Sequence, residues 1–230
     1  MRPTRRDFVG ISLATATAAV AATQATAQAP TQSPNEKPAK LVPRAGGDLL
    51  SRMTWFNPPA NEHYDEGKLD ARTKAKTDFW RKTYYGYITD NGHFLHLPVT
   101  GDFKFTARVG GNYAALYDQA GLMVRLDEKR WMKCGSEFFE NRRWASVVFT
   151  HDFSDWSTQD DLTQVGPVYW RVVRTRDSIE AQCSKDGEKF TTVRQGYFPP
   201  AVEVKVGLMC AAPEGQGLDC VFDQVSLDNL

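Results

Sequence analysis

Residues 202–210 read Val-Glu-Val-Lys-Val-Gly-Leu-Met-Cys, and this stretch decides the fold class. Apolar side chains occupy every second position of it, namely Val202, Val204, Val206, Leu208 and Cys210. Successive side chains of a β-strand point to opposite faces, so the alternation predicts a strand with one buried face and one more polar face.

The same period of two recurs on both sides of this stretch. Further runs cover residues 103–109, 119–126, 131–138, 145–149, 170–172, 179–183 and 220–227. Turn signals such as Asp90-Asn91-Gly92 and Lys185-Asp186-Gly187 separate them, and no helical period extends beyond a turn or two. We therefore predict an all-β fold built as an antiparallel two-sheet sandwich, with a closed barrel as the alternative.

The N-terminal part differs in composition from the strand-rich part. Residues 1–27 combine Arg5-Arg6 before Phe8, a soft Ala/Thr-rich run and small residues at Ala25 and Ala27. This layout predicts a cleaved bacterial twin-arginine signal peptide, which would use the twin-arginine export machinery. The predicted location is therefore periplasmic or secreted, with no membrane association after cleavage.

Three ranges follow for the domain organisation: a signal peptide over 1–27, a disordered Pro-rich spacer over 28–47 and one β-sandwich domain over 48–230. The whole chain has no net charge, and loss of 1–27 leaves it near −2. A near-neutral domain lacks the basic surface that nucleic acid requires, so we expect no nucleic-acid partner.

Cysteine and metal patterns point to no cofactor. The spacings of Cys134, Cys183, Cys210 and Cys220 match no zinc motif, and haem, flavin and phosphate-loop motifs are absent from the sequence. The sequence is compatible with two states of these cysteines, a Cys210–Cys220 disulfide or four buried thiols. The acid-rich loop 151–161 leaves a structural calcium site open, although its spacing matches no defined calcium loop.

Several segments together resemble a known family. They are Trp55–Pro59, Thr77–Arg81, Asp90–Phe94, Tyr117–Arg125, Trp131–Glu137 and Phe153–Ser157. The sequence is similar to the "regulation of enolase" type family, a domain of unknown function with a concanavalin A-like jelly-roll fold. The resemblance covers residues 49–228 and implies a lectin- or glucanase-type sandwich with a concave face. It supplies a fold and a ligand class rather than a mechanism.

The polar positions of the predicted strands suggest a binding face. Strand parity puts hydrogen-bonding side chains opposite the core at Gln119, Arg125, Lys133, Glu137 and Arg171. If these strands share one concave sheet, the side chains form a row, and Trp156, Trp80 and His93 near turns would add a platform and rim. Saccharide recognition uses such groups with an aromatic ring. We therefore predict an exported, lectin-like, non-catalytic protein that binds a saccharide or cell-wall polysaccharide.

Two alternatives remain at this stage. The first is a small glycan hydrolase or lyase centred on Glu137. Such an enzyme needs two carboxylates about 5 to 9.5 Å apart, whereas Glu137 and Glu140 fall on opposite faces of a regular strand. Asp118 or His151 would then have to supply the partner. The second alternative is a protein-interaction module, which the fold permits but no sequence feature marks.

Overall fold

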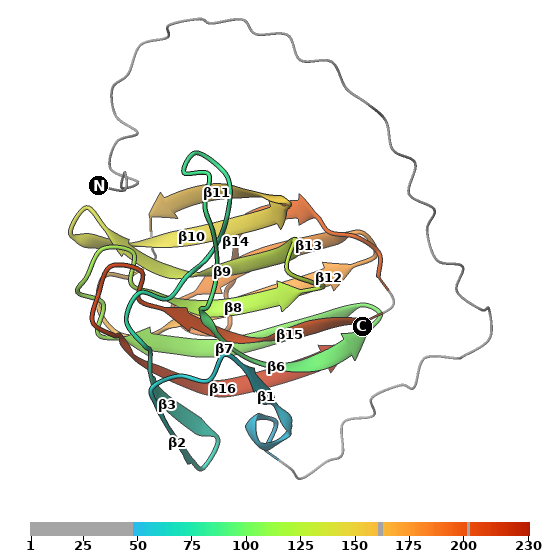
Figure 1. The fold of residues 1–230 in the computed structure, drawn as a ribbon. Coiled ribbons are helices and arrows are strands. Elements are labelled where there is room, and N and C mark those ends of the chain that lie inside the picture. Colours follow the sequence, from blue (N-terminus) through green and yellow to red (C-terminus); the bar gives the residue numbers. More distant parts are fainter. Residues whose placement is uncertain (1–47, 161–162, 202) are drawn as a thin grey trace, which may run out of the picture. The chain divides into compact units, whose positions relative to one another are not determined.

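The computed structural model describes residues 48–160, 163–201 and 203–230, and these residues form two packed sheets. The predicted signal peptide and spacer lie outside the described residues. The first sheet has the order β1 (Thr54–Phe56), β6 (His93–Thr100), β15 (Glu203–Ala211), β8 (Gln119–Arg125), β9 (Arg130–Phe139), β10 (Arg142–His151) and β11 (Phe153–Asp160). Figure 1 shows these strands side by side.

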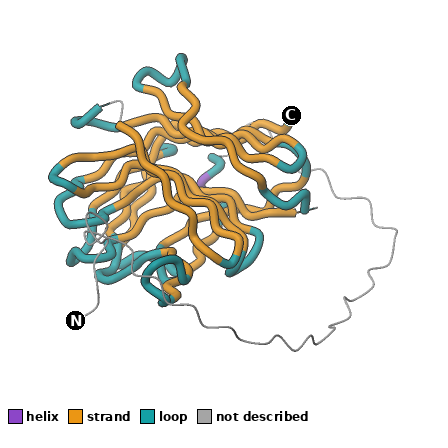
Figure 2. Tube along the Cα trace, turned by 90° about the horizontal axis from the view of Figure 1, so that it is seen from above, coloured by secondary structure: helices purple, strands orange, loops and turns teal. Residues whose placement is uncertain are grey.

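The second sheet also has seven strands. Its order is β14 (Thr191–Tyr197), β13 (Ser178–Ser184), β12 (Val168–Thr175), β7 (Phe103–Gly111), β16 (Asp219–Asn229), β3 (Lys68–Arg72) and β2 (Asn61–Asp65). Neighbouring strands in both sheets pair antiparallel. A short 3-10 helix, η2 (Leu50–Arg52), precedes β1. The two layers are seen from above in Figure 2, and the predicted antiparallel sandwich is confirmed.

The core lies between the two sheets and follows the predicted alternation. On β15, Val204, Val206, Leu208 and Cys210 are buried in the same apolar cluster as Trp170 of the second sheet. Burying one large apolar side chain stabilises the fold by about 1.5 to 3 kcal/mol. The four cysteines are buried and none is in a disulfide in the structure, so the bridge considered for Cys210 and Cys220 is not formed. Among the described residues, no helix is long and apolar enough to cross a membrane.

Part of the outer face of the first sheet is covered, which the alternation of apolar and polar residues does not reveal. Residues 77–92, here called the strap, contain the small antiparallel pair β4 (Phe79–Arg81) and β5 (Ile88–Asp90). Phe79 and Trp80 of the strap pack with Met123 and Trp131 of the sheet in a second apolar cluster. Figure 1 shows this blue-green segment crossing the strands from β8 to β11.

Two glycines allow strands β8 and β9 to approach closely beneath the strap. Gly121 and Gly135 are directly opposite each other in the ladder. A Cβ at Gly121 would lie 1.9 Å from the carbonyl oxygen of Cys134, and one at Gly135 would lie 2.2 Å from that of Ala120. No side chain fits at either position, so the floor of this face is bare backbone.

Candidate functional site

Three of the predicted site residues hold the strap. Lys133 Nζ lies 3.0 Å from Asp78 Oδ1 and donates a 2.8 Å hydrogen bond to the carbonyl oxygen of Phe79. Gln119 Nε2 donates to the same Asp78 oxygen at 3.3 Å. Because Lys133, Gln119 and Asp78 are all buried, these groups satisfy one another and tie the start of the strap to strands β8 and β9.

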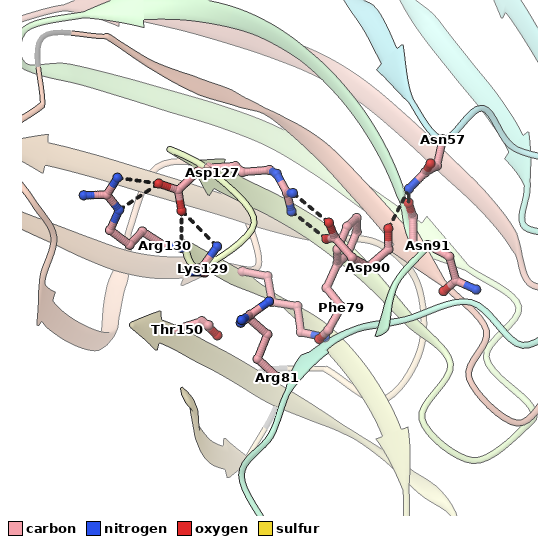
Figure 3. Close-up of polar contacts among 12 residues, drawn as sticks. Asn57, Phe79, Arg81, Asp90, Asn91, Asp127, Lys129, Arg130 and Thr150 are labelled. Carbon is pink, nitrogen blue, oxygen red and sulfur yellow. Dashed lines mark hydrogen bonds and ion pairs between the residues drawn. The ribbon is translucent and has the colours of Figure 1, made fainter. Parts of the chain in front are cut away.

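Arg125 holds the other end of the strap. Its guanidinium forms a two-pronged ion pair with Asp90, with N–O distances of 2.6 and 2.8 Å. The side-chain amide of Asn57 donates to the backbone carbonyl of Asp90 at 3.0 Å (Figure 3). Arg125 also lies 4.7 Å from the centre of the Phe56 ring. The structure therefore gives Arg125 a positioning contact within the protein.

Glu137 and Trp156 meet beside the strap. Trp156 Nε1 donates hydrogen bonds to Glu137 Oε2 at 2.9 Å and to Ser146 Oγ at 3.0 Å. Glu137 is buried, whereas Trp156 is half-buried. The indole is thus held by two acceptors, while part of its ring remains in contact with solvent.

Two more aromatic rings continue from Trp156. Phe139 lies 5.4 Å from Trp156 at an interplanar angle of 60° and stacks on Trp144 at 5.1 Å and 13°. All three rings are half-buried, and we call them the aromatic shelf. Strand parity puts Phe139 and Trp144 on the face of Glu137, because Trp144 is opposite Glu137 in the ladder. Phe139 and Trp144 are not among the predicted site residues, although strand parity alone places both on the face of Glu137.

A small polar cavity lies next to the shelf. It has a volume of about 10 Å³ and is lined by Gln119, Lys133, Glu137 and Ser146 above the Gly135 backbone, together with Cys134, Ser136 and Met209. This is space for about one water molecule or one hydroxyl group. A whole sugar ring does not fit there, so a larger ligand would have to lie on the shelf.

Three other predicted site residues are not part of this group. Arg171 lies on β12 in the second sheet, where its Nε donates to Thr106 Oγ1 at 3.1 Å and its guanidinium stacks on Phe190. The expectation that it shares a sheet with the other four is wrong, because strand parity reports a face but not which sheet the face belongs to. Partial burial lowers the pKa of Arg171.

Trp80 and His93 are interior residues rather than a platform and rim. Trp80 is 3 % exposed, and its Nε1 donates to the carbonyl of Thr83 at 3.1 Å. The Lys74 N–H donates to His93 Nε2 at 2.9 Å, and His93 Nδ1 lies 2.8 Å from the Asn57 carbonyl. Burial lowers the pKa of His93 and so favours its neutral form.

The side chains considered as partners of Glu137 in an enzyme, Asp118 and His151, are held by backbone groups. Asp118 Oδ2 accepts the backbone N–H groups of Ala114 and Ala115 at 3.0 and 2.8 Å, and burial raises its pKa. His151 lies at the opposite end of β10 from the residue that pairs with Glu137, and its Nε2 contacts the Tyr197 carbonyl at 3.1 Å. Both side chains are thus engaged with backbone groups, and none of these contacts joins them to Glu137.

The segment predicted as an acid-rich loop is mostly strand β11, because residues 153–160 pair with β10, and its acidic side chains form ion pairs. Asp155 lies 2.9 Å from Arg194, Asp160 lies 2.9 Å from Arg142, and Asp152 contacts both Arg81 and Lys82. In the part of the chain that the structure describes, no group of three or more His, Cys, Asp or Glu side chains is placed to hold a metal ion.

Comparison with known proteins gives a family and a fold. A family model described as "Protein of unknown function (DUF1349)" matches residues 55–230. A protein of Saccharomyces cerevisiae named "Regulation of enolase protein 1" is 39% identical over 178 residues, which are 77% of this chain and 90% of that protein. A solved structure of a functionally unknown S. cerevisiae protein has 38% identity and a TM-score of 0.76, and covers 79% of this chain and 98% of that one. The predicted resemblance is thus confirmed.

More distant structures share only the fold. A GH43 protein of Bacillus licheniformis, BlXynB K247S, has a TM-score of 0.63 at 13% identity, over 80% of this chain and 39% of its own. The carbohydrate-binding module CBM66 of Bacillus subtilis has a TM-score of 0.53 at 11% identity, over 77% of this chain and 97% of its own. Both likenesses support the jelly-roll sandwich.

The predicted location is wrong. The similar protein and the similar structure come from yeast, a eukaryote, and this conflicts with twin-arginine export into a bacterial periplasm. The prediction depended on a short pattern of two arginines before an Ala/Thr-rich run within residues 1–27, which lie outside the described residues. Such a pattern reports local composition and charge, and it does not identify the machinery that reads them.

Proposed function

Since this chain belongs to the DUF1349 family, whose description assigns no activity, we propose a function from the site: the sandwich binds a saccharide on the outer face of its first sheet. The aromatic shelf and Glu137 are the proposed contacts. The observation that carries the proposal is the half-buried Trp156 ring, held by Glu137 Oε2 and Ser146 Oγ beside Phe139 and Trp144. A fixed aromatic ring beside buried hydrogen-bonding groups suits a sugar, whose C–H face is apolar and whose edge carries hydroxyl groups.

The small cavity adds a polar contact to this proposal. It holds one water-sized group among Gln119, Lys133, Glu137 and Ser146. One sugar hydroxyl that replaces a water there would meet both donors and acceptors, while the ring itself lies on the shelf. The likeness to a carbohydrate-binding module supports a fold able to present such a face, and the contacts proposed here are those of this chain alone.

The proposed activity is binding rather than cleavage. The Asp118 carboxylate accepts backbone N–H groups of its own loop, His151 contacts the Tyr197 carbonyl, and Glu137 accepts a hydrogen bond from Trp156. We expect polysaccharide length to stay unchanged on prolonged incubation with the protein, as measured by size-exclusion chromatography. Shortened chains that disappear with Glu137→Gln would favour the hydrolase or lyase alternative.

A glycan array with the full chain tests the proposal. Trp156→Ala removes the ring of the shelf that is bound to Glu137, and we expect it to weaken binding at least tenfold. Phe190→Ala is the matched control, because Phe190 is also half-buried and stacks on Arg171 of the second sheet. Selective binding that survives Trp156→Ala, or no selective binding by the wild type, would contradict the proposed site.

A further inference from the structure

A ring of contacts joins the strap to β9, β10 and the start of β11. Trp131 is opposite Thr150 in the ladder, and Thr150 Oγ1 lies 2.9 Å from Ser154 Oγ. Ser154 Oγ accepts the backbone N–H of Arg81 at 2.9 Å. Arg81 Nη2 then contacts Asp152 Oδ1 at 2.9 Å.

The turn before β9 completes this ring. The Asp152 N–H donates to the Lys129 carbonyl at 2.8 Å, and Lys129 precedes Trp131 by two residues. The close-up shows Arg81, Thr150 and Lys129 near one another, drawn from the strap, the sheet and the turn respectively (Figure 3). We call this set the cation ring, and it consists of Arg81, Lys129, Trp131, Thr150, Asp152 and Ser154.

Two buried donors of the cation ring lack an acceptor. Arg81 is 6 % exposed and Trp131 is 1 % exposed, yet Arg81 Nε and Trp131 Nε1 have no hydrogen-bond partner among the described residues. Buried N–H groups in native proteins are nearly always paired. The two unpaired donors on this one ring are available to an acceptor group from outside the chain.

The local charge favours an anion as that acceptor. Arg81 and Lys82 share the single carboxylate of Asp152, so this corner carries one more positive charge than negative. Lys129 is exposed and adds another positive charge, and the neighbouring Glu128 offsets one.

The other charged groups that face the cation ring are already paired. Arg125 is bound to Asp90, and Asp127 is bound to Arg130 (Figure 3). They add no net charge to the corner. The positive surplus therefore stays with Arg81, Lys82 and Lys129.

We propose that the cation ring is a binding site for a carboxylate group. A carboxylate has two acceptor oxygens and one negative charge, which match the two unpaired donors and the surplus positive charge. The group could belong to an acidic sugar or to a small free carboxylate. This site shares no residue with the aromatic shelf.

The indole resonances of the full chain give a direct test. We would titrate the protein with sodium acetate, sodium D-glucuronate and D-glucose at constant ionic strength, and follow the indole N–H signals by NMR. Trp131→Phe assigns the Trp131 signal. Trp170 is the internal control, because its Nε1 is also buried without a partner but lies in the core between the sheets. We expect both carboxylates, but not glucose, to shift Trp131 saturably and leave Trp170 unchanged.

Variants separate this site from the shelf and identify the source of the carboxylate. Arg81→Lys keeps the charge but removes the Nε donor, and we expect it to weaken binding at least tenfold; Lys129→Gln, on the surface, should weaken it about twofold to fivefold. Trp156→Ala should leave the response intact.

Tighter binding of glucuronate than of acetate would identify an acidic sugar, and equal binding would identify a small carboxylate. A Trp131 signal that ignores both carboxylates, or that glucose shifts equally, would overturn the proposal.

Discussion

Lys133 and Asp78 form an ion pair whose side chains are only 4% and 8% exposed. Two charges are out of water there, and each depends on the other and on the hydrogen bonds from Gln119 and to Phe79. Removing one partner of such a pair leaves an uncompensated buried charge, which costs far more than the net contribution of the pair. Lys133 is therefore a residue that positions the strap.

The first prediction concerns this ion pair. Asp78→Ala should lower the free energy of unfolding by about 3 to 5 kcal/mol, because Lys133 stays charged and buried. Urea denaturation measures the loss. The double variant Asp78→Leu with Lys133→Met should recover most of it, since both charges are then gone. A loss below about 1 kcal/mol in the single variant would show that the pair is solvated.

A second single residue, His96, makes the free energy of unfolding depend on pH. Its burial, and then the positive charges of Lys205 and Arg125, lower the pKa of His96 to about 4. In the unfolded chain the pKa is about 6.5, so the unfolded state binds the proton first as the pH falls. Stability is complete above pH 6.5 and decreases between pH 6.5 and 4.

The second prediction is a decrease of roughly 1 to 2 kcal/mol across this range, after allowance for the partial solvation of the ring. Thermal or urea unfolding at a series of pH values measures it. His96→Leu should flatten the profile, because it removes the titrating imidazole. The substitution costs no hydrogen bond of Nδ1, since His96 Nδ1 has no partner among the described residues. His93, whose pKa is also lowered, supplies the slope that remains. An unchanged profile in His96→Leu would contradict this assignment.

The strap is an element held by side chains. Strands β4 and β5 pair with each other and join neither large sheet. Its attachments are the Lys133–Asp78 and Arg125–Asp90 ion pairs, the hydrogen bond between Arg81 and Ser154, and the apolar cluster around Phe79. Elements with few ladder hydrogen bonds open at lower free energy than central strands.

The third prediction follows from that attachment. Asp90→Asn weakens the contact with Arg125, and amide exchange across residues 79–90 should become at least tenfold faster, while β7 and β12 keep their protection. Hydrogen–deuterium exchange with mass spectrometry reads both regions in one experiment. Asp223→Asn is the matched control, because Asp223 pairs with Arg108 on the second sheet. Equal acceleration in all strands would mean that the strap and sandwich open as one unit.

At the scale of the whole molecule, the sandwich encloses all four thiols between its sheets. Cys134 and Cys210 belong to the first sheet, Cys183 and Cys220 to the second, and all are buried. Burial raises the pKa of the Cys134 and Cys220 thiols. Because the thiolate is the reactive form, these cysteines should be inert in the native state.

The fourth prediction tests this enclosure. Iodoacetamide at pH 8 should modify none of the four cysteines in the native protein and all four in urea, as counted by intact mass. The melting temperature should not change when a reductant is added. A lower melting temperature with reductant would show a disulfide, with Cys210 and Cys220 as the first pair to examine.

Several features of the whole molecule were predictable because they depend on neighbours along the chain. Alternation placed Val204, Val206, Leu208 and Cys210 in the core. It also placed Gln119, Arg125, Lys133 and Glu137 on one outer face, and all four do lie on the first sheet. Family and antiparallel sandwich were predicted as well, whereas ligand binding by these residues stays a prediction.

Local sequence patterns specify which residues form strands and which side chains share a face, because a period of two is a local property of the backbone. What lies over each face depends instead on how distant parts of the chain pack together. The strap is far from β9 in sequence, and its contacts with Lys133 exist only once the sheets have packed. Long-range packing likewise put Arg171 on the second sheet and joined Arg81 to the turn before Trp131. Such contacts depend on which distant segments bury each other, and no local pattern encodes that.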